Sequence, residues 1–174
     1  MRAEDPALDD TAALGSLISP VAGGRVEKLV TDAISKGANI RAGTASFNGA
    51  IAQPVVLEGV REDMDLYYQE SFGPVVAIFE FATNEEAIRL ANDTEYGLVC
   101  SVFSKDVAEA LAVGRKIRSG SCHINGATVY DEPHLPLGGQ KASGFGRFGG
   151  MACVNEFTED RVVTIKAPGQ HYPI

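Results

Sequence analysis

Apolar residues recur along this chain with helical and strand periods in turn, which predicts a mixed architecture. From Ser19 to Gly37 the spacing is helical: Ser19-Pro20 is typical of an N-cap followed by proline at the first helical position, and Gly37 ends the pattern. Strands are expected near Ala38–Arg41 and at Pro54–Glu58. The apolar stripe of the helix consists of Ala22, Val26, Leu29, Val30 and Ala33.

From Val75 onward strands and helices alternate. Val75–Phe81 is almost continuously apolar, as expected of a strand covered on both faces. Further strands are expected at Leu98–Phe103 and Ser121–Asn125, and the helices between them begin at two capping boxes, Thr83–Glu86 and Asp106–Glu109. This order predicts an α/β fold with two right-handed crossovers and an open, mostly parallel sheet with flanking helices.

The last elements expected are a helix around Gly150–Phe157 and a strand at Arg161–Lys166. In open parallel sheets, ligands bind at the carboxyl ends of the strands. The loop after Ile124 is therefore the place where a functional site is expected.

Composition restricts the function classes. A chain of 174 residues fits one domain, and its net charge of -8 without a basic cluster argues against nucleic-acid binding. No stretch approaches membrane-spanning length, and residues 1–10 are acidic and lack an apolar signal core. The three cysteines have no C-x-x-C spacing, so neither a metal site nor a disulfide framework is expected. These features predict a cytoplasmic globular chain.

One glycine motif is misleading. Gly144–Gly149 matches G-x-G-x-x-G, the fingerprint of dinucleotide-binding βαβ units. The fingerprint requires a preceding strand, a following helix and an acidic residue about 20 positions on. Here Pro136–Ser143 is expected to be loop, and the later position falls in Pro168–Gln170. We therefore interpret these glycines as a loop that lets the backbone approach another surface closely.

Two segments resemble a known family. Gln69–Val75 (QESFGPV) and Pro136–Gly150 (PLGGQKASGFGRFGG) resemble parts of the C-terminal half of NAD(P)-dependent aldehyde dehydrogenases, which oxidise aldehydes to carboxylic acids. The resemblance extends from about Leu17 to Lys166. In the family the position of Leu137 is aromatic and lies at the mouth of the aldehyde tunnel. The resemblance implies a partial catalytic lobe in residues 1–148, followed in residues 149–174 by a C-terminal helix, an oligomerisation strand and a tail.

The resemblance assigns cofactor-binding roles to Glu70 and Phe72. The matching glutamate accepts hydrogen bonds from both hydroxyls of the nicotinamide ribose of NAD or NADP, a task suited to the two acceptor oxygens of a carboxylate. The matching aromatic residue packs beside that ribose. Residue type alone would instead favour a surface glutamate and a core phenylalanine. The family's nucleophilic cysteine and general-base glutamate lie upstream of this segment, so no catalytic residue is assigned here and the chain alone is expected to be inactive.

The cysteines and histidines allow other interpretations. Cys100 and Cys153 are most simply small buried apolar residues. Cys122 and His123 are neighbours on one predicted strand and should point to opposite faces, which argues against a catalytic dyad. His134 either lines an aldehyde entrance or is a solvated loop residue.

The resemblance is closest to the branch that acts on salicylaldehyde, vanillin or benzaldehyde. It rests on Cys122–Gly126, Thr128–Pro133 and Gly146–Gly150. Three functions remain open: the C-terminal part of an aromatic-aldehyde dehydrogenase, a non-catalytic module that docks on full-length aldehyde dehydrogenases, or a separate enzyme that uses its own cysteine. The resemblance also implies that Arg161–Lys166 joins a sheet between subunits of a homo-oligomer or of full-length relatives; the alternative is that it extends the chain's own sheet.

Overall fold

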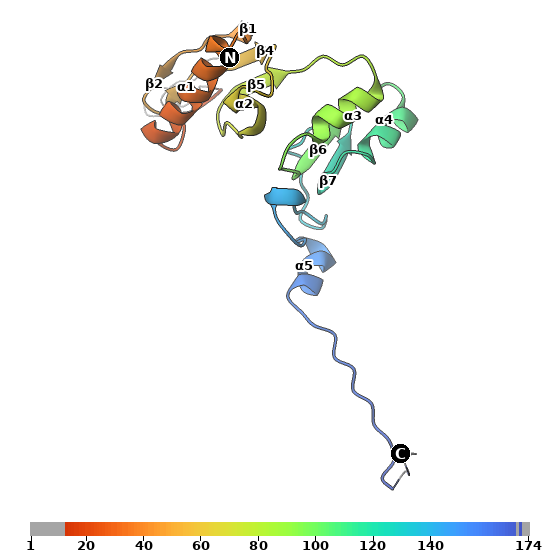
Figure 1. The fold of residues 1–174 in the computed structure, drawn as a ribbon. Helices are drawn as coiled ribbons and strands as arrows, with labels where there is room; N and C mark the ends of the chain where they lie inside the picture. The colour runs from red at the N-terminus through yellow and green to blue at the C-terminus, as the bar shows by residue number, and fades with distance from the viewer. Residues whose placement is uncertain (1–12, 170, 172–174) are drawn as a thin grey trace. The chain divides into compact units, whose positions relative to one another are not determined.

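The computed structural model describes residues 13–169 and 171, which form an α/β fold (Figure 1). The chain divides into two compact units, residues 1–87 and 88–174, with the division inside α3. The helices are α1 (Pro20–Ser35), α2 (Asp65–Tyr68), α3 (Asn84–Asn92), α4 (Val107–Gly114) and α5 (Gly150–Glu156), with a 3-10 turn η1 (Lys141–Ser143). The strands are β1 (Asn39–Gly43), β2 (Phe47–Asn48), β3 (Ile51–Ala52), β4 (Val55–Glu58), β5 (Val75–Ile78), β6 (Val99–Val102) and β7 (Ser121–Ile124).

The first unit contains a three-stranded sheet of order β1-β4-β5, packed against α1 (Figure 1). β4 pairs antiparallel with β1 and parallel with β5. The core joins Val26 and Val30 of α1 to Val55 and Leu57 of β4, and none of these four side chains is more than 1% exposed. The small hairpin of β2 and β3 lies against the same helix.

The predicted limits of α1 are confirmed. The Ser19 Oγ accepts the N–H of Ala22 at 3.2 Å, which satisfies one of the free amides of the first turn. After the C-cap, Gly37 adopts a positive φ of 102°, a conformation that glycine adopts without steric cost. The buried residues of the helix include four of the five apolar residues expected at the sequence level.

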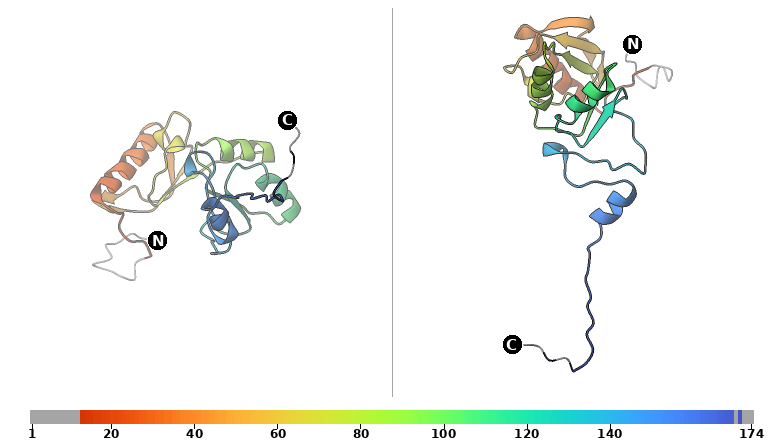
Figure 2. Two further views of the ribbon diagram at one scale, coloured as in Figure 1. Left: turned by 90° about the horizontal axis from the view of Figure 1, so that it is seen from below. Right: turned by 90° about the vertical axis from the view of Figure 1, so that its right-hand side faces the viewer.

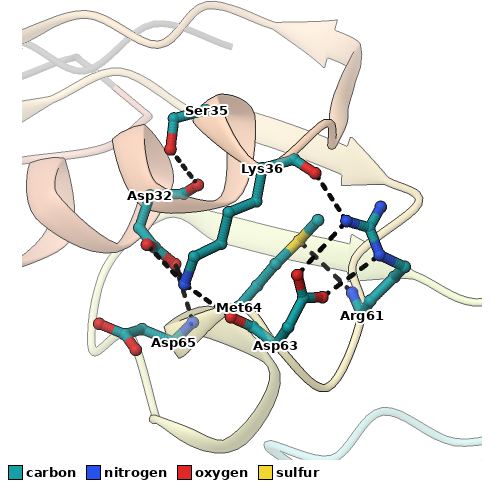
Figure 3. A network of polar contacts seen from close by, with 7 residues as sticks. All are labelled: Asp32, Ser35, Lys36, Arg61, Asp63, Met64 and Asp65. Carbon is teal, nitrogen blue, oxygen red and sulfur yellow. Dashed lines mark hydrogen bonds and ion pairs between the residues drawn. The ribbon is translucent and has the colours of Figure 1, made fainter.

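A polar network joins the end of α1 to the segment that leads into α2 (Figure 3). The Lys36 ammonium lies 2.8 Å from a carboxylate oxygen of Asp32 and donates to the Asp63 carbonyl at 2.6 Å. Asp32 also accepts the N–H of Asp65 at 2.9 Å, and Arg61 donates to the Lys36 carbonyl at 2.7 Å. The hydrogen bond from Lys36 lowers the pKa of Asp32, and in return the pKa of Lys36 is raised.

The second unit contains a βαβ motif in which α4 connects the parallel strands β6 and β7, as predicted. The Asp106 carboxylate caps α4 by accepting the N–H groups of Ala108 and Glu109. Two further views show α4 beside these strands (Figure 2), and an added Cβ on Gly114 would lie 2.7 Å from the Cys122 Sγ. The glycine therefore allows close packing of the helix on β7.

The α/β class is confirmed, but the expectation that the strands from Val75 to Asn125 share one parallel sheet is wrong. Among the described residues there are three small sheets, and β5 pairs with β4 rather than with β6. The capping box before α3 is confirmed, because the Thr83 Oγ1 accepts the N–H of Glu86 at 3.2 Å. A hydrophobic strand pattern predicts that a strand exists but leaves its neighbour open. None of the described helices has the length and apolarity needed to cross a membrane.

The strand expected at Arg161–Lys166 is also not formed. The segment has neither helical nor strand structure after α5. Its apolar side chains are exposed: Val162 by 87%, Val163 by 69% and Ile165 by 91%. The physical reason is that a strand is completed by hydrogen bonds to a neighbouring strand, and the described part of this chain does not pair with the segment. The alternative in which it extends the chain's own sheet is therefore contradicted.

Candidate functional site

Glu70 and Phe72 lie on a turn between α2 and β5. Glu70 is exposed, and among the described residues its carboxylate makes no hydrogen bond or ion pair. Phe72 is 77% exposed, so it is not the core phenylalanine that residue type alone suggested. The turn therefore presents an acceptor carboxylate and an aromatic ring together on the surface of the first unit.

The backbone of this turn is unusual and is contacted by α1. Phe72 has a positive φ of 45°, which is rare for a bulky residue. Arg25 donates to the Glu70 carbonyl at 2.7 Å and also to the Ser71 carbonyl, and its guanidinium carbon lies 5.8 Å from the centre of the Phe72 ring. Nothing in the sequence pattern had indicated Arg25, because its partners lie more than 40 positions away.

The glycine-rich segment after β7 is a loop, as predicted. Its Gly144–Gly149 run follows the 3-10 turn η1 rather than a strand, and an isolated bridge joins Leu137 to Phe148. The helix that follows, α5, is only seven residues long. The run therefore lacks the strand–turn–helix context of a dinucleotide fingerprint.

Three polar side chains tie this loop to its own unit. Lys141 donates to the carbonyls of Asn92 and Thr94 at 3.1 and 2.9 Å, at the end of α3. The Ser143 Oγ accepts the N–H of Gly97 at 2.9 Å. The third side chain, Arg147, donates to two carbonyls within the loop, those of Gly139 and Gly146 at 2.8 and 2.6 Å. Lys141 and Ser143 therefore hold the loop to residues 92–97, whereas Arg147 holds the loop to itself.

The loop after Ile124 borders a hollow of about 570 Å³ at the carboxyl end of β7. The ring of His123 packs edge-on against Tyr130 at 5.8 Å between centroids, and the Tyr130 hydroxyl donates to Glu132, which raises the pKa of Tyr130. The lining consists of Cys122, His123, Ile124, Gly126, Ala127, Val129 and Tyr130. A site was expected at this end of the strands, and the structure places the hollow there.

His134 does not line this hollow. Its side chain is 72% exposed, and its Nδ1 lies 3.3 Å from a carboxylate oxygen of Glu132. The solvated-loop interpretation of His134 therefore holds for the described residues, and the entrance interpretation gains no support from the lining.

The cysteine thiols are poor candidates for nucleophiles. Cys100 and Cys122 are register partners on β6 and β7. Partial burial, together with the hydrogen bond to Cys100, raises the pKa of Cys122 to about 11. Among the described residues no hydrogen bond joins Cys122 to His123, as expected for strand neighbours. Cys100 and Cys153 are partly buried rather than fully buried as expected.

The model of the aldehyde dehydrogenase family matches residues 1–163. The chain belongs to the aldehyde dehydrogenase family. It is 47% identical over all its 174 residues to the vanillin dehydrogenase of Pseudomonas fluorescens, of which it covers 36%. The chain thus spans about a third of the length of the curated relatives it matches.

Solved structures agree with this assignment. The salicylaldehyde dehydrogenase of Pseudomonas putida G7, solved with salicylaldehyde, superposes with a TM-score of 0.92 at 42% identity, covering 98% of this chain and 35% of that one. An aldehyde dehydrogenase of Mycobacterium tuberculosis, solved with NAD+, gives a TM-score of 0.82 at 36% identity, covering 91% of this chain and 33% of that one. The resemblance inferred from the two sequence segments is therefore confirmed, including its closeness to enzymes of aromatic aldehydes.

Proposed function

We propose that this chain forms the C-terminal part of an NAD(P)-dependent aldehyde dehydrogenase that oxidises an aromatic aldehyde to its carboxylic acid. The observation that carries the proposal is the exposed Glu70–Phe72 turn, with an uncommitted carboxylate beside an exposed ring. Membership of the family and the names of the relatives support it.

In this proposal Glu70 binds the nicotinamide ribose of NAD or NADP. Two carboxylate oxygens match two vicinal hydroxyls, and exposure leaves both oxygens accessible to a ligand. Phe72 limits the movement of the same ribose by packing beside it. The relative solved with NAD+ supports a nicotinamide dinucleotide as the cofactor.

The aldehyde would approach the loop between β7 and the glycine-rich segment. The hollow there is lined partly by apolar residues, including Ile124 and Val129, and by the aromatic Tyr130. Such a lining suits a planar ring, since ligand pockets are mostly apolar with a few polar groups. Leu137, where the family has an aromatic residue, is half-buried and forms a bridge to Phe148 of the glycine-rich segment, and it would modify substrate preference.

The test of the cofactor role compares Glu70→Gln with Glu62→Gln in an intact aldehyde dehydrogenase that carries this segment. Glu62 is an exposed glutamate of the same unit. Losing a charged hydrogen bond costs about 1–3 kcal/mol, so Glu70→Gln should slow hydride transfer or cofactor release about 5- to 150-fold. Equal kinetics in the two variants would contradict the role of Glu70.

We further propose that the 174-residue chain alone neither turns over aldehyde nor binds NAD tightly. Covalent capture of an aldehyde requires an activated thiolate, and a Cys122 pKa of about 11 leaves almost none at neutral pH. Mixing the chain with benzaldehyde and NAD should give no NADH. Steady turnover abolished by Cys122→Ala, or micromolar NAD affinity by calorimetry, would overturn this statement.

A second candidate function is association with copies of this chain or with full-length aldehyde dehydrogenases. Its support is the exposed apolar segment Arg161–Lys166, which lacks strand structure. A strand added to a partner's sheet would gain main-chain hydrogen bonds worth about 1 kcal/mol each. In this proposal residues 1–148 belong to the catalytic lobe and residues 149–174 to the association region. A clean monomer in light scattering, unchanged by deletion of residues 161–174, would exclude it.

A further inference from the structure

We propose that Arg25 of α1 is a positioning residue that fixes the direction in which Glu70 meets the nicotinamide ribose. The inference rests on the proposed cofactor role of Glu70. In this proposal Arg25 contacts neither the cofactor nor the aldehyde. It acts through the backbone of the turn that carries Glu70 and Phe72.

The contacts of Arg25 are directed at main-chain atoms. One guanidinium nitrogen donates to the Glu70 carbonyl at 2.7 Å and the other donates to the carbonyl of Ser71. The same group lies over the Phe72 ring, 5.8 Å from its centre. One side chain therefore restrains three consecutive residues, and the two cofactor-binding candidates are the first and the last of them.

The turn needs such a restraint. Phe72 holds a left-handed conformation that bulky side chains rarely adopt, so the surroundings must enforce it. The turn's own side-chain contacts are long: the Ser71 Oγ lies 3.4 Å from both the nitrogen and the oxygen of Gly73. Arg25 supplies the shorter hydrogen bonds, and its charge strengthens them.

The helix approaches the turn closely beside Arg25. An added Cβ on Gly73 would lie 2.7 Å from a methyl carbon of Val26, so glycine allows this approach. Val26 is fully buried in the core, whereas Arg25 is exposed. Replacing Arg25 therefore removes the restraint on the turn and leaves the core packing of α1 intact.

Arginine suits this task better than lysine. Its planar fork donates to two acceptors at once and lies flat over an aromatic ring, whereas an ammonium is a single compact charge. Arg25→Lys should keep the charge near the turn but lose the paired hydrogen bonds. Arg25→Met should lose both while keeping an unbranched side chain. Lys28→Met, an exposed cation of the same helix, is the matched control.

The first experiment measures hydrogen exchange in the 174-residue chain. In Arg25→Met the amides of Ser71, Phe72, Gly73 and Val75 should exchange on the order of tenfold faster than in Lys28→Met, because charged hydrogen bonds that restrain the turn are gone. Arg25→Lys should give an intermediate exchange rate. If the methionine variant folds poorly, the comparison of Arg25→Lys with Lys28→Met tests the restraint instead. Equal exchange in Arg25→Met and Lys28→Met would overturn the restraint itself.

The second experiment measures kinetics in an intact aldehyde dehydrogenase that carries this segment. Arg25→Met should raise the KM for NAD or lower kcat about 10- to 100-fold, because a small misplacement of a positioned group has effects of that size. The KM for the aldehyde and the Tm should match those of Lys28→Met, and Arg25→Lys should recover part of the loss. A merely structural role would change the Tm and both KM values together, which would overturn the proposal.

Glu70→Gln separates the two possible failures. If Glu70→Gln slows the enzyme but Arg25→Met does not, the positioning role of Arg25 is refuted and the cofactor role of Glu70 stands. If Glu70→Gln has no effect, the cofactor role fails and the positioning role fails with it.

Discussion

Replacing Ser143 by alanine tests whether the glycine-rich loop is held by its own polar side chains. The hydroxyl accepts the N–H of Gly97 at 2.9 Å, and the same Gly97 offers its carbonyl to the N–H groups of Gly120 and Gln140 at 3.0 and 2.8 Å. Gly97 thus connects the loop to the start of β7. Ser143→Ala should loosen this connection without changing any buried apolar contact.

The magnitude follows from what is left unpaired. A buried donor that loses its partner costs about 1–3 kcal/mol, and partial exposure of Ser143 lets water recover some of that, so about 1 kcal/mol is expected. For a unit of this size that lowers the Tm by about 4–8 °C. The assay is calorimetry of the 174-residue chain, with hydrogen exchange at Gly97 as the local measurement.

Ser16→Ala, an exposed serine outside the loop, is the control. Equal Tm values for the two variants, with unchanged exchange at Gly97, would refute the view that Ser143 anchors the loop. Lys141→Met removes a second anchor of the same loop. If both residues hold the loop, the double variant should lose more stability than either single variant.

Further predictions concern the core, a thiol and the polar network. Leu57→Ala should destabilise the first unit by about 2–5 kcal/mol in denaturant unfolding, because Leu57 is fully buried. Labelling of Cys122 by a disulfide reagent should be slow at pH 8 and accelerate up to about pH 11, where its thiol ionises. The lowered pKa of Asp32 gives stability that is present above its ordinary value of 3.8 and is lost as the pH falls through the lower folded pKa. The raised pKa of Lys36 gives stability that is present below 10.5 and is lost as the pH rises through the higher folded pKa. Asp32→Asn should abolish both dependences in pH-resolved melting curves.

Features specified by neighbouring residues were predictable from the sequence. The N-cap at Ser19, the capping residues before α3 and α4, and the βαβ motif of β6, α4 and β7 are all present. The pairing of β5 with β4 was not predictable, because a hydrophobic run leaves the partner strand open. The expected cover on both faces of Val75–Phe81 is also wrong, since Val76 is 55% and Phe81 57% exposed. Arg161–Lys166 has β-favouring residues, yet propensity alone does not complete a strand.

In the candidate site, too, local features were predictable from the sequence and long-range contacts were not. Glu70 and Phe72 were assigned to the site from a contiguous motif, and the assignment stays a prediction; the structure shows that both residues are exposed. Arg25 was missed, because its hydrogen bonds to Glu70 and Ser71 span 45 and 46 positions.

The hydrogen bonds that hold the glycine-rich loop have a consequence for mutational scans. Lys141, Ser143 and Arg147 donate to or accept from backbone groups of their own unit, whereas the Glu70 carboxylate has no such commitment among the described residues. A scan scored by cellular abundance should therefore penalise substitutions at the first three positions and tolerate those at Glu70. A scan scored by catalytic output of the intact enzyme should penalise all four. Comparing the two scores at each position would separate residues selected for folding from residues selected for chemistry.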